Sequence, residues 1–130
     1  MTMSDAKPRV LDVGQCDLDH SNITRMLKEC FDATVDRARD NAQVDHLLDF
    51  YEYDLILVNR IFDADASSGQ DLISRLKSGD AATETPVMLV SNYEDAQDTA
   101  LLSGAVKGFG KSALGTEETI KLLSLYLSGK

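Results

Sequence analysis

Short, continuous apolar runs recur along the chain, separated by longer stretches with helical periodicity. The runs are apolar at consecutive positions rather than at alternate ones, and they are too short to be helices. A strand of this kind is buried on both faces, as in a parallel sheet that helices cover on each side. The strands expected on this basis are residues 9–13, 33–37, 54–58, 86–90 and 106–109.

The segments between these runs carry apolar residues three and four positions apart, which is the spacing of one helical face. The expected helical segments are Ile23–Phe31, Val44–Tyr51, Leu72–Leu76, 94–102 and 116–127. Five strands that alternate with five helices build a parallel sheet with helices on both faces. A site in such a sheet is expected at the carboxyl ends of the strands.

Length and charge narrow the class of protein. The chain has 130 residues, so we expect one domain over residues 1–130, with residues 1–7 disordered. A net charge of −9 argues against nucleic-acid binding, which depends on clustered Lys and Arg. No apolar run approaches the roughly 18 residues of a membrane span, and the first residues are too polar for a signal peptide. We therefore expect a cytoplasmic protein that binds neither nucleic acid nor membranes.

Three stretches at the expected strand ends carry a resemblance to a known family. They are Tyr53–Asn59, Pro86–Ser91 and Gly104–Lys111. In this order and at these spacings they resemble the receiver domain of response regulators (CheY-like), over 9–127. The resemblance implies a flavodoxin-like, three-layer α/β/α fold with a five-stranded parallel sheet of strand order 2-1-3-4-5. It also implies a phosphoryl group that passes from a histidine kinase to an aspartate beside a Mg²⁺ ion.

The site that the resemblance implies lacks its three carboxylates. Asn59 stands at the position of the aspartate nucleophile, and a neutral amide cannot form an acyl phosphate. Gly14 and Gln15 replace the acidic pair that would hold Mg²⁺, a cation that requires hard oxygen ligands. Ser91 and Lys111 keep the positions of the hydroxyl and the lysine that contact the phosphoryl oxygens. We therefore expect no metal and no cofactor at this cluster.

Two further departures affect the family's response to phosphorylation. Gly108 stands at the aromatic position of the last strand, and Phe109, one residue later, should point to the opposite face. Ser112 follows the lysine where the family has proline, which puts the usual cis peptide bond in doubt. The aromatic switch of the family is therefore expected to be absent.

Lys111 has no phosphate to bind under this interpretation and should pair with a carboxylate. The candidates are Asp12, Asp17, Asp63 and Asp65. Asp12 lies within an apolar strand, where a carboxyl group must be paired or protonated. Asp63 and Asp65 have a spacing that is typical of a solvated turn.

The cysteines and histidines form no recognisable site. Cys16 and Cys30 flank about ten helical residues, which places them about 15 Å apart, beyond the reach of a disulfide bond. Cys16 lies near the start of a helix, where a thiol pKa can fall. His20 and His46 lack partners at ligand spacing, so we expect both at the surface.

These observations favour a degenerate receiver, or pseudo-receiver, that keeps the fold, has lost phosphotransfer and is not an enzyme. It would act in two-component phosphorelay signalling by docking to a protein partner. Two alternatives stay open. One is an active phosphoacceptor that uses Asp63 or Asp65, and the other is a small-anion sensor at a pocket with Ser91 and Lys111.

The last expected helix carries two apolar stripes. Ile120, Leu123 and Leu127 follow the spacing of a core stripe, and a second, offset stripe should be partly exposed. In receivers the face formed by the fourth helix, fifth strand and fifth helix is the usual docking and dimer surface. The residues expected at an interface with a signalling protein or a second copy are Leu101, Leu122, Leu125 and Tyr126.

Overall fold

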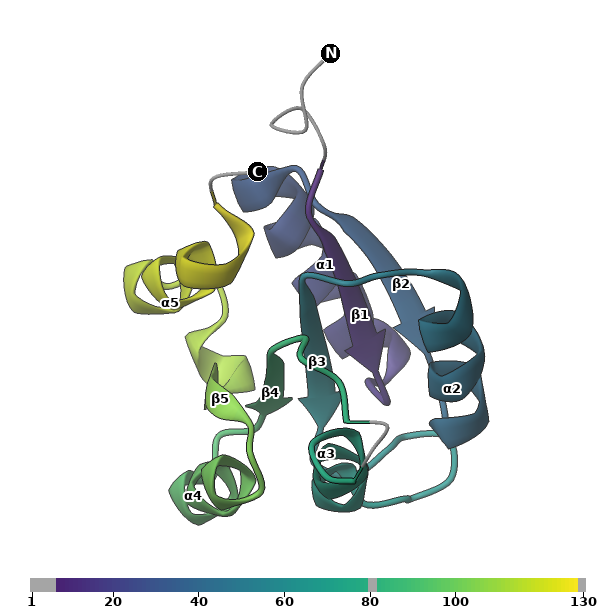
Figure 1. Cartoon of the computed structure of the whole chain (residues 1–130). Coiled ribbons are helices and arrows are strands. Elements are labelled where there is room, and N and C mark those ends of the chain that lie inside the picture. The colour runs from purple at the N-terminus through teal and green to yellow at the C-terminus, as the bar shows by residue number, and fades with distance from the viewer. Residues whose placement is uncertain (1–6, 80–81, 129–130) are drawn as a thin grey trace.

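A computed structural model describes residues 7–79 and 82–128, and in this part of the chain five parallel strands form one sheet of order β2-β1-β3-β4-β5 (Figure 1). The elements are β1 (Arg9–Val13), α1 (Asp17–Phe31), β2 (Thr34–Ala38), α2 (Asn41–Phe50), β3 (Leu55–Asn59), α3 (Gly69–Leu76), β4 (Val87–Val90), α4 (Glu94–Leu102), β5 (Val106–Phe109), a 3₁₀ turn (Lys111–Ala113) and α5 (Glu117–Leu127). The expected three-layer α/β/α, flavodoxin-like fold is confirmed, with β1 between β2 and β3.

Three of the expected strands are displaced or shortened by one residue. The second strand starts at Thr34 because Thr34 pairs with Arg9 and Ala38 with Val13. The fourth starts at Val87 because Pro86 has no N–H to donate, although its carbonyl accepts from Ile56 N at 2.9 Å. The third strand ends at Asn59 rather than one residue earlier.

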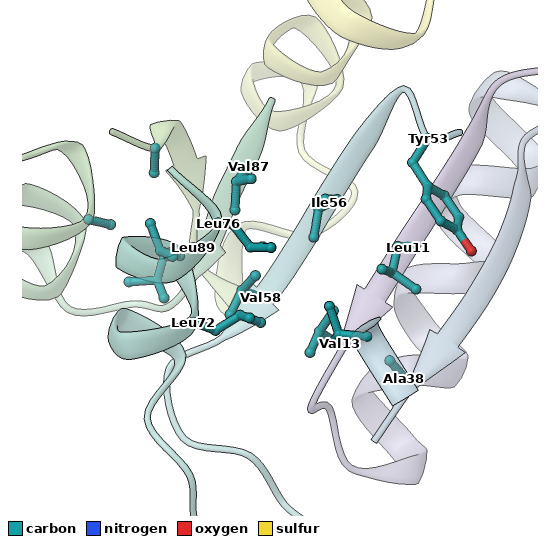
Figure 2. Packing of buried hydrophobic residues seen from close by; sticks show 14 of the residues in the cluster. Leu11, Val13, Ala38, Tyr53, Ile56, Val58, Leu72, Leu76, Val87 and Leu89 are labelled. Atoms are coloured by element: carbon teal, nitrogen blue, oxygen red, sulfur yellow. The ribbon is translucent and has the colours of Figure 1, made fainter. Parts of the chain in front are cut away.

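The core has two apolar layers, one on each face of the sheet. Side chains of β1 to β4 that point one way pack against α2, α3 and α4 (Figure 2). This layer contains Leu11, Val13, Ala38, Val44, Tyr53, Ile56, Val58, Phe62, Leu72, Ile73, Leu76, Val87, Leu89, Ala100 and Ala105. The other layer lies against α1 and α5 and contains Val10, Ile23, Met26, Leu27, Ala33, Leu55, Leu57, Met88, Val90, Phe109, Leu123 and Leu127.

The pairing of β4 with β5 is irregular. Met88 pairs with Val106 and Val90 with Phe109, so β5 has one extra residue between these two pairs. Because of this bulge, two β5 residues that are three positions apart point to the same face of the sheet. Val106 and Phe109 accordingly both pack in the layer of α1 and α5.

The expectation of disorder at the N-terminus concerns residues 1–7, of which 1–6 lie outside the described residues. Lys7 is exposed, and its Nζ lies 3.4 Å from a carboxylate oxygen of Asp32. Within residues 7–79 and 82–128, no helix combines the length and the apolar character that crossing a membrane requires.

Candidate functional site

The carboxyl ends of β3, β4 and β5 surround a cavity of about 330 Å³, the strand-end cavity. Its lining residues are Asn59, Arg60, Ile61, Val90, Ser91, Asn92, Tyr93 and Lys111. The structure thus brings together three of the five residues that the sequence singled out. The other two, Gly14 and Gln15, follow β1, and neither lines the cavity.

The Asn59 side chain closes the gap between the ends of β1 and β3. Its Nδ2 donates to the carbonyl oxygen of Gly14 at 3.0 Å and to that of Ile61 at 2.7 Å. Carbonyl oxygens gathered in this way suit a hard cation, but here both N–H groups of a neutral amide satisfy them. The amide is 8% exposed, so these bonds are shielded from competing water.

Phe62 occupies the space that a side chain at Gly14 would need. Gly14 has φ +79°, and a Cβ built on it would lie 2.4 Å from Cδ1 of Phe62. Phe62 belongs to the core layer of α2, α3 and α4 and is 1% exposed. A carboxylate at this position is therefore excluded by packing and by backbone conformation together. Sequence reasoning missed Phe62, although an aromatic residue in a polar loop is a usable signal of burial.

Gln15 follows β1 and contacts the Arg37 guanidinium. Gln15 is buried, and its side chain lies near the Asp12 carboxyl. Its backbone oxygen accepts from Nη2 of Arg37 at 2.9 Å, and the same Nη2 lies 2.9 Å from Oδ1 of Asp17. The guanidinium of Arg37 thus links the backbone of Gln15 to the carboxylate of Asp17.

Lys111 pairs with a carboxylate, as expected, but with a different one. Its Nζ lies 2.9 Å from Oδ2 of Asp19, and this hydrogen bond lowers the pKa of the Asp19 carboxyl. α1 and α5 cover the same face, which brings the first turn of α1 toward the residues between β5 and α5. The four candidates offered by the sequence, Asp12, Asp17, Asp63 and Asp65, are therefore wrong.

Asp12 pairs with His20, so the expectation that His20 lacks a partner is wrong. Nδ1 of His20 lies 2.6 Å from Oδ2 of Asp12, whose side chain is fully buried. Burial raises the pKa of Asp12, while the neighbouring His20 opposes that shift. The contact joins β1 to α1. Sequence spacings that identify metal or relay histidines do not identify a pair of this kind. His46 is exposed, as expected, with its ring 4.9 Å from that of Phe50.

Gln97 ties α4 to the ends of β4 and β5. Its Nε2 lies 2.9 Å from Leu89 O, 3.1 Å from Ser91 O and 3.4 Å from Phe109 O. The Gln97 amide also lies close to Gly108. A Cβ added to Gly108 would lie 2.1 Å from Leu89 O and 3.0 Å from Gln97 Oε1. The position where receivers carry an aromatic ring is therefore filled by a hydrogen-bonded amide from α4.

The loop after β3 holds the two alternative carboxylates at the surface. Asp63 and Asp65 are exposed, and neither lines the strand-end cavity. Oδ1 of Asp65 accepts from Ser67 N at 2.9 Å, and this turn lowers the pKa of Asp65. Asp63 N donates to Gly14 O at 2.9 Å. Within the described residues, no group of three or more His, Cys, Asp or Glu side chains could hold a metal ion.

On the other side of the cavity, Ser91 and Asn92 are held by short loop contacts. Ser91 Oγ accepts from Tyr93 N at 3.2 Å. Asn92 Oδ1 accepts from the backbone N and the hydroxyl of Ser112, both at 3.0 Å, and the peptide bond before Ser112 is trans.

The apolar residues expected at an interface divide into two groups. Leu125 is 73% exposed and Leu101 is 44% exposed. Leu122 and Tyr126 are half-buried against the core layer of α1 and α5, so the offset stripe is only partly available. Leu102, which the sequence did not single out, is 90% exposed.

The free cysteines are Cys16, half-buried, and Cys30, exposed.

No protein-family model and no curated protein matches the sequence. Solved receiver structures do match the fold. The signal receiver domain of a DNA-binding response regulator from Colwellia psychrerythraea 34H has a TM-score of 0.76 and 20% identity, covering 92% of this chain and 97% of that one. The chemotaxis response regulator CheY4 of Vibrio cholerae has a TM-score of 0.71 and 16% identity, covering 94% and 100%.

A third match holds a modified site. It is a response regulator from Burkholderia pseudomallei with a phosphorylated aspartic acid, a calcium ion and citrate. Its TM-score is 0.70 at 15% identity, with 94% of this chain and 68% of that chain covered. At these identities the matches establish that the chain has the fold of receiver domains.

Proposed function

We propose that the chain is a receiver-type signalling module of two-component systems that does not transfer phosphoryl groups and acts by docking to a protein partner. The observation that carries this proposal is the closed end of β1 and β3. There the Asn59 amide bonds the Gly14 and Ile61 carbonyls, and Phe62 fills the space beside Gly14. The solved receiver structures of the same fold support the signalling context.

Phosphoryl transfer to a receiver needs an ionised nucleophile and a cation that neutralises the developing charge. The similar response regulator from Burkholderia pseudomallei carries both a phosphorylated aspartic acid and a calcium ion. In this chain Asn59 offers an amide whose two N–H groups are already used, and Gly14 and Gln15 supply no carboxylate. The module is accordingly not an enzyme.

Loss of phosphorylation leaves the docking surface in one permanent state. Gln97 holds α4 against β4 and β5 through three carbonyl oxygens, so no aromatic ring is available to shift. Leu101 and Leu102 on α4 and Leu125 on α5 remain exposed for a partner. The partner is a signalling protein or a second copy of the chain that buries these leucines.

Phosphodonor treatment tests the first half of the proposal. The chain is incubated with acetyl phosphate and Mg²⁺ and its intact mass is measured. We expect no phosphoryl adduct. An adduct that maps to Asp63 or Asp65 would overturn the proposal in favour of an active phosphoacceptor.

Leu125→Glu tests the docking half. A charge in the apolar part of an interface weakens association without disturbing a monomer in which residue 125 is exposed. Leu18→Glu is the matched control, because Leu18 is 68% exposed at the start of α1. Light scattering measures self-association, and co-purification from native cells measures hetero-association. If Leu125→Glu and Leu18→Glu behave alike in both, the α4 and α5 surface is not the docking site.

A small-anion sensor is a second candidate that the strand-end cavity favours. Arg60, Ser91, Asn92 and Lys111 line its wall. Two contacts oppose it, since Lys111 is neutralised by Asp19 and the Arg60 guanidinium lies 4.9 Å from the centre of the Tyr93 ring. A rise in melting temperature with phosphate, abolished by Lys111→Met, would favour the sensor over the docking module.

A further inference from the structure

A second chemically distinctive cluster lies on α1, away from the strand-end cavity. A groove of about 480 Å³, here the His20 groove, is lined by His20, Ser21, Thr24, Arg25, Lys28 and Glu29. Behind the histidine lies Asp12 on β1, which is fully buried. None of these residues takes part in the proposed docking function.

The contacts of the imidazole determine which nitrogen faces the groove. Nδ1 of His20 lies 2.6 Å from Oδ2 of Asp12, so the two groups share one hydrogen bond. We assign the proton of this bond to Nδ1, and the lone pair of the ring is then on Nε2. Oγ1 of Thr24 lies 3.4 Å from Nε2, so an electrophile that reaches Nε2 displaces this long contact. The side chain is 20% exposed, so the ring is held in place with one edge open.

The rim of the groove supplies positive charge in an acidic protein. Arg25 and Lys28 line it with a single carboxylate, Glu29, whereas the chain as a whole carries −9. Arg25 is oriented by a 2.6 Å hydrogen bond from its Nη2 to Asn22 Oδ1. Two cations on the rim of the groove attract an anionic electrophile to it.

We propose that Nε2 of His20 is a nucleophile that accepts a phosphoryl group from an N-phosphoryl donor of the phosphoramidate class. The Nε2 lone pair forms the new N–P bond while the donor's P–N bond breaks and ammonia leaves with the proton already on its nitrogen. The ring becomes a phosphorylated imidazolium that keeps its Nδ1 proton. The Asp12 carboxylate, 2.6 Å away, stabilises that cation.

The test uses phosphoramidate and the second histidine of the chain as an internal control. His46 is more exposed than His20, and its ring packs at a tilt of 58° against Phe50. Adducts are located by peptide mass spectrometry at neutral to alkaline pH, where an N–P bond survives. We expect His20 to react at least about tenfold faster than His46, although accessibility alone predicts the reverse.

Two variants identify the residues responsible. Asp12→Asn preserves the shape but removes the carboxylate charge, and it should slow modification of His20 about tenfold or more while His46 is unchanged. His46→Asn should leave the rate at His20 unaltered. Circular dichroism verifies the fold of each variant, and the comparison of the two histidines in the unaltered chain needs no variant.

Equal or slower reaction at His20, or no adduct on it at all, would overturn the inference. A failure of this inference can be distinguished from a failure of the proposed function. A phosphohistidine is acid-labile, whereas an acyl phosphate on Asp63 or Asp65 survives mild acid. An acid-labile adduct at His20 supports this inference and leaves the absence of aspartyl phosphate unaffected, while an acyl phosphate contradicts the proposed function alone.

Discussion

The carboxyl ends of β1 and β3 differ from those of β4 and β5 in what fills them. On the first side, the Phe62 ring and the Asn59 amide occupy the space beside Gly14 and leave no carboxylate. On the second side, Ser91 and Lys111 still face a cavity of about 330 Å³. Both sides belong to one edge of one sheet, which is closed by packing in one half and open in the other.

The difference shows that one edge of a sheet can combine a closed, neutral half with an open, polar half. An amide and an aromatic ring carry no charge, so the first half is easier to bury than a group of carboxylates would be. The half with Ser91 and Lys111 stays polar because Asp19 satisfies the lysine from α1. The predictions below test whether the first half is rigidly closed and the second loosely held.

The largest effect is expected from Gly14→Ala. The added Cβ would clash with Phe62 at 2.4 Å in a backbone with φ +79°, so we expect a loss of about 3–5 kcal/mol of unfolding free energy. Gly115→Ala is the matched control, with φ +83° and nothing within 4 Å of the new atom. Urea denaturation measures both. Equal losses of unfolding free energy in the two variants would mean that the Phe62 side chain moves aside at little cost and that this half is not closed.

Asn59→Asp should have the next largest effect. It replaces two N–H donors by a carboxylate oxygen that faces the Gly14 and Ile61 carbonyls, at a cost of about 2–3 kcal/mol. The repulsion raises the pKa of the new carboxyl, so its protonated form favours the folded state. The variant should therefore recover stability as the pH falls from about 8 to about 4, relative to the unaltered chain.

The control for that substitution lies in the open half. Asn92 is exposed and only accepts hydrogen bonds from Ser112 through Oδ1, so Asn92→Asp should cost well under about 1 kcal/mol. Asn59→Asp should also remain unphosphorylated by acetyl phosphate with Mg²⁺, because one carboxylate without the acidic pair holds the cation weakly. Efficient phosphorylation of this single variant would contradict the importance given to the pair.

The smallest effect is expected from Lys111→Met. An ion pair as exposed as Lys111–Asp19 contributes less than about 1 kcal/mol. Lys111 lowers the pKa of Asp19 below its ordinary 3.8, so the stabilisation is present above that pH and is lost as the pH falls through the lower folded value.

In the variant the pKa of Asp19 should return toward 3.8, as measured by NMR titration of the carboxyl carbon. Lys107→Met, at an exposed position on β5, is the control and should leave Asp19 unchanged. An unaltered Asp19 titration in Lys111→Met would show that the pair does not persist in solution.

Much of the fold follows from local patterns in the sequence. The apolar runs predicted every strand to within one residue, and Asp40 and Thr116 cap their helices through bonds to Gln43 N and Thr119 N. The same patterns placed Asn59, Ser91 and Lys111 at one edge of the sheet, where they line one cavity. Strand and helix periodicity is a property of neighbouring residues, so the sequence alone determines it.

The partners of individual side chains were decided by the tertiary structure. Asp19 rather than another acid reaches Lys111, Asp12 finds His20, and Phe62 fills the space beside Gly14. Each contact joins two elements whose distance depends on how the helices lie on the sheet, to within a few ångströms. A displacement of a few ångströms is enough to break a hydrogen bond or a packing contact. The periodicity of apolar residues along the chain does not depend on such displacements.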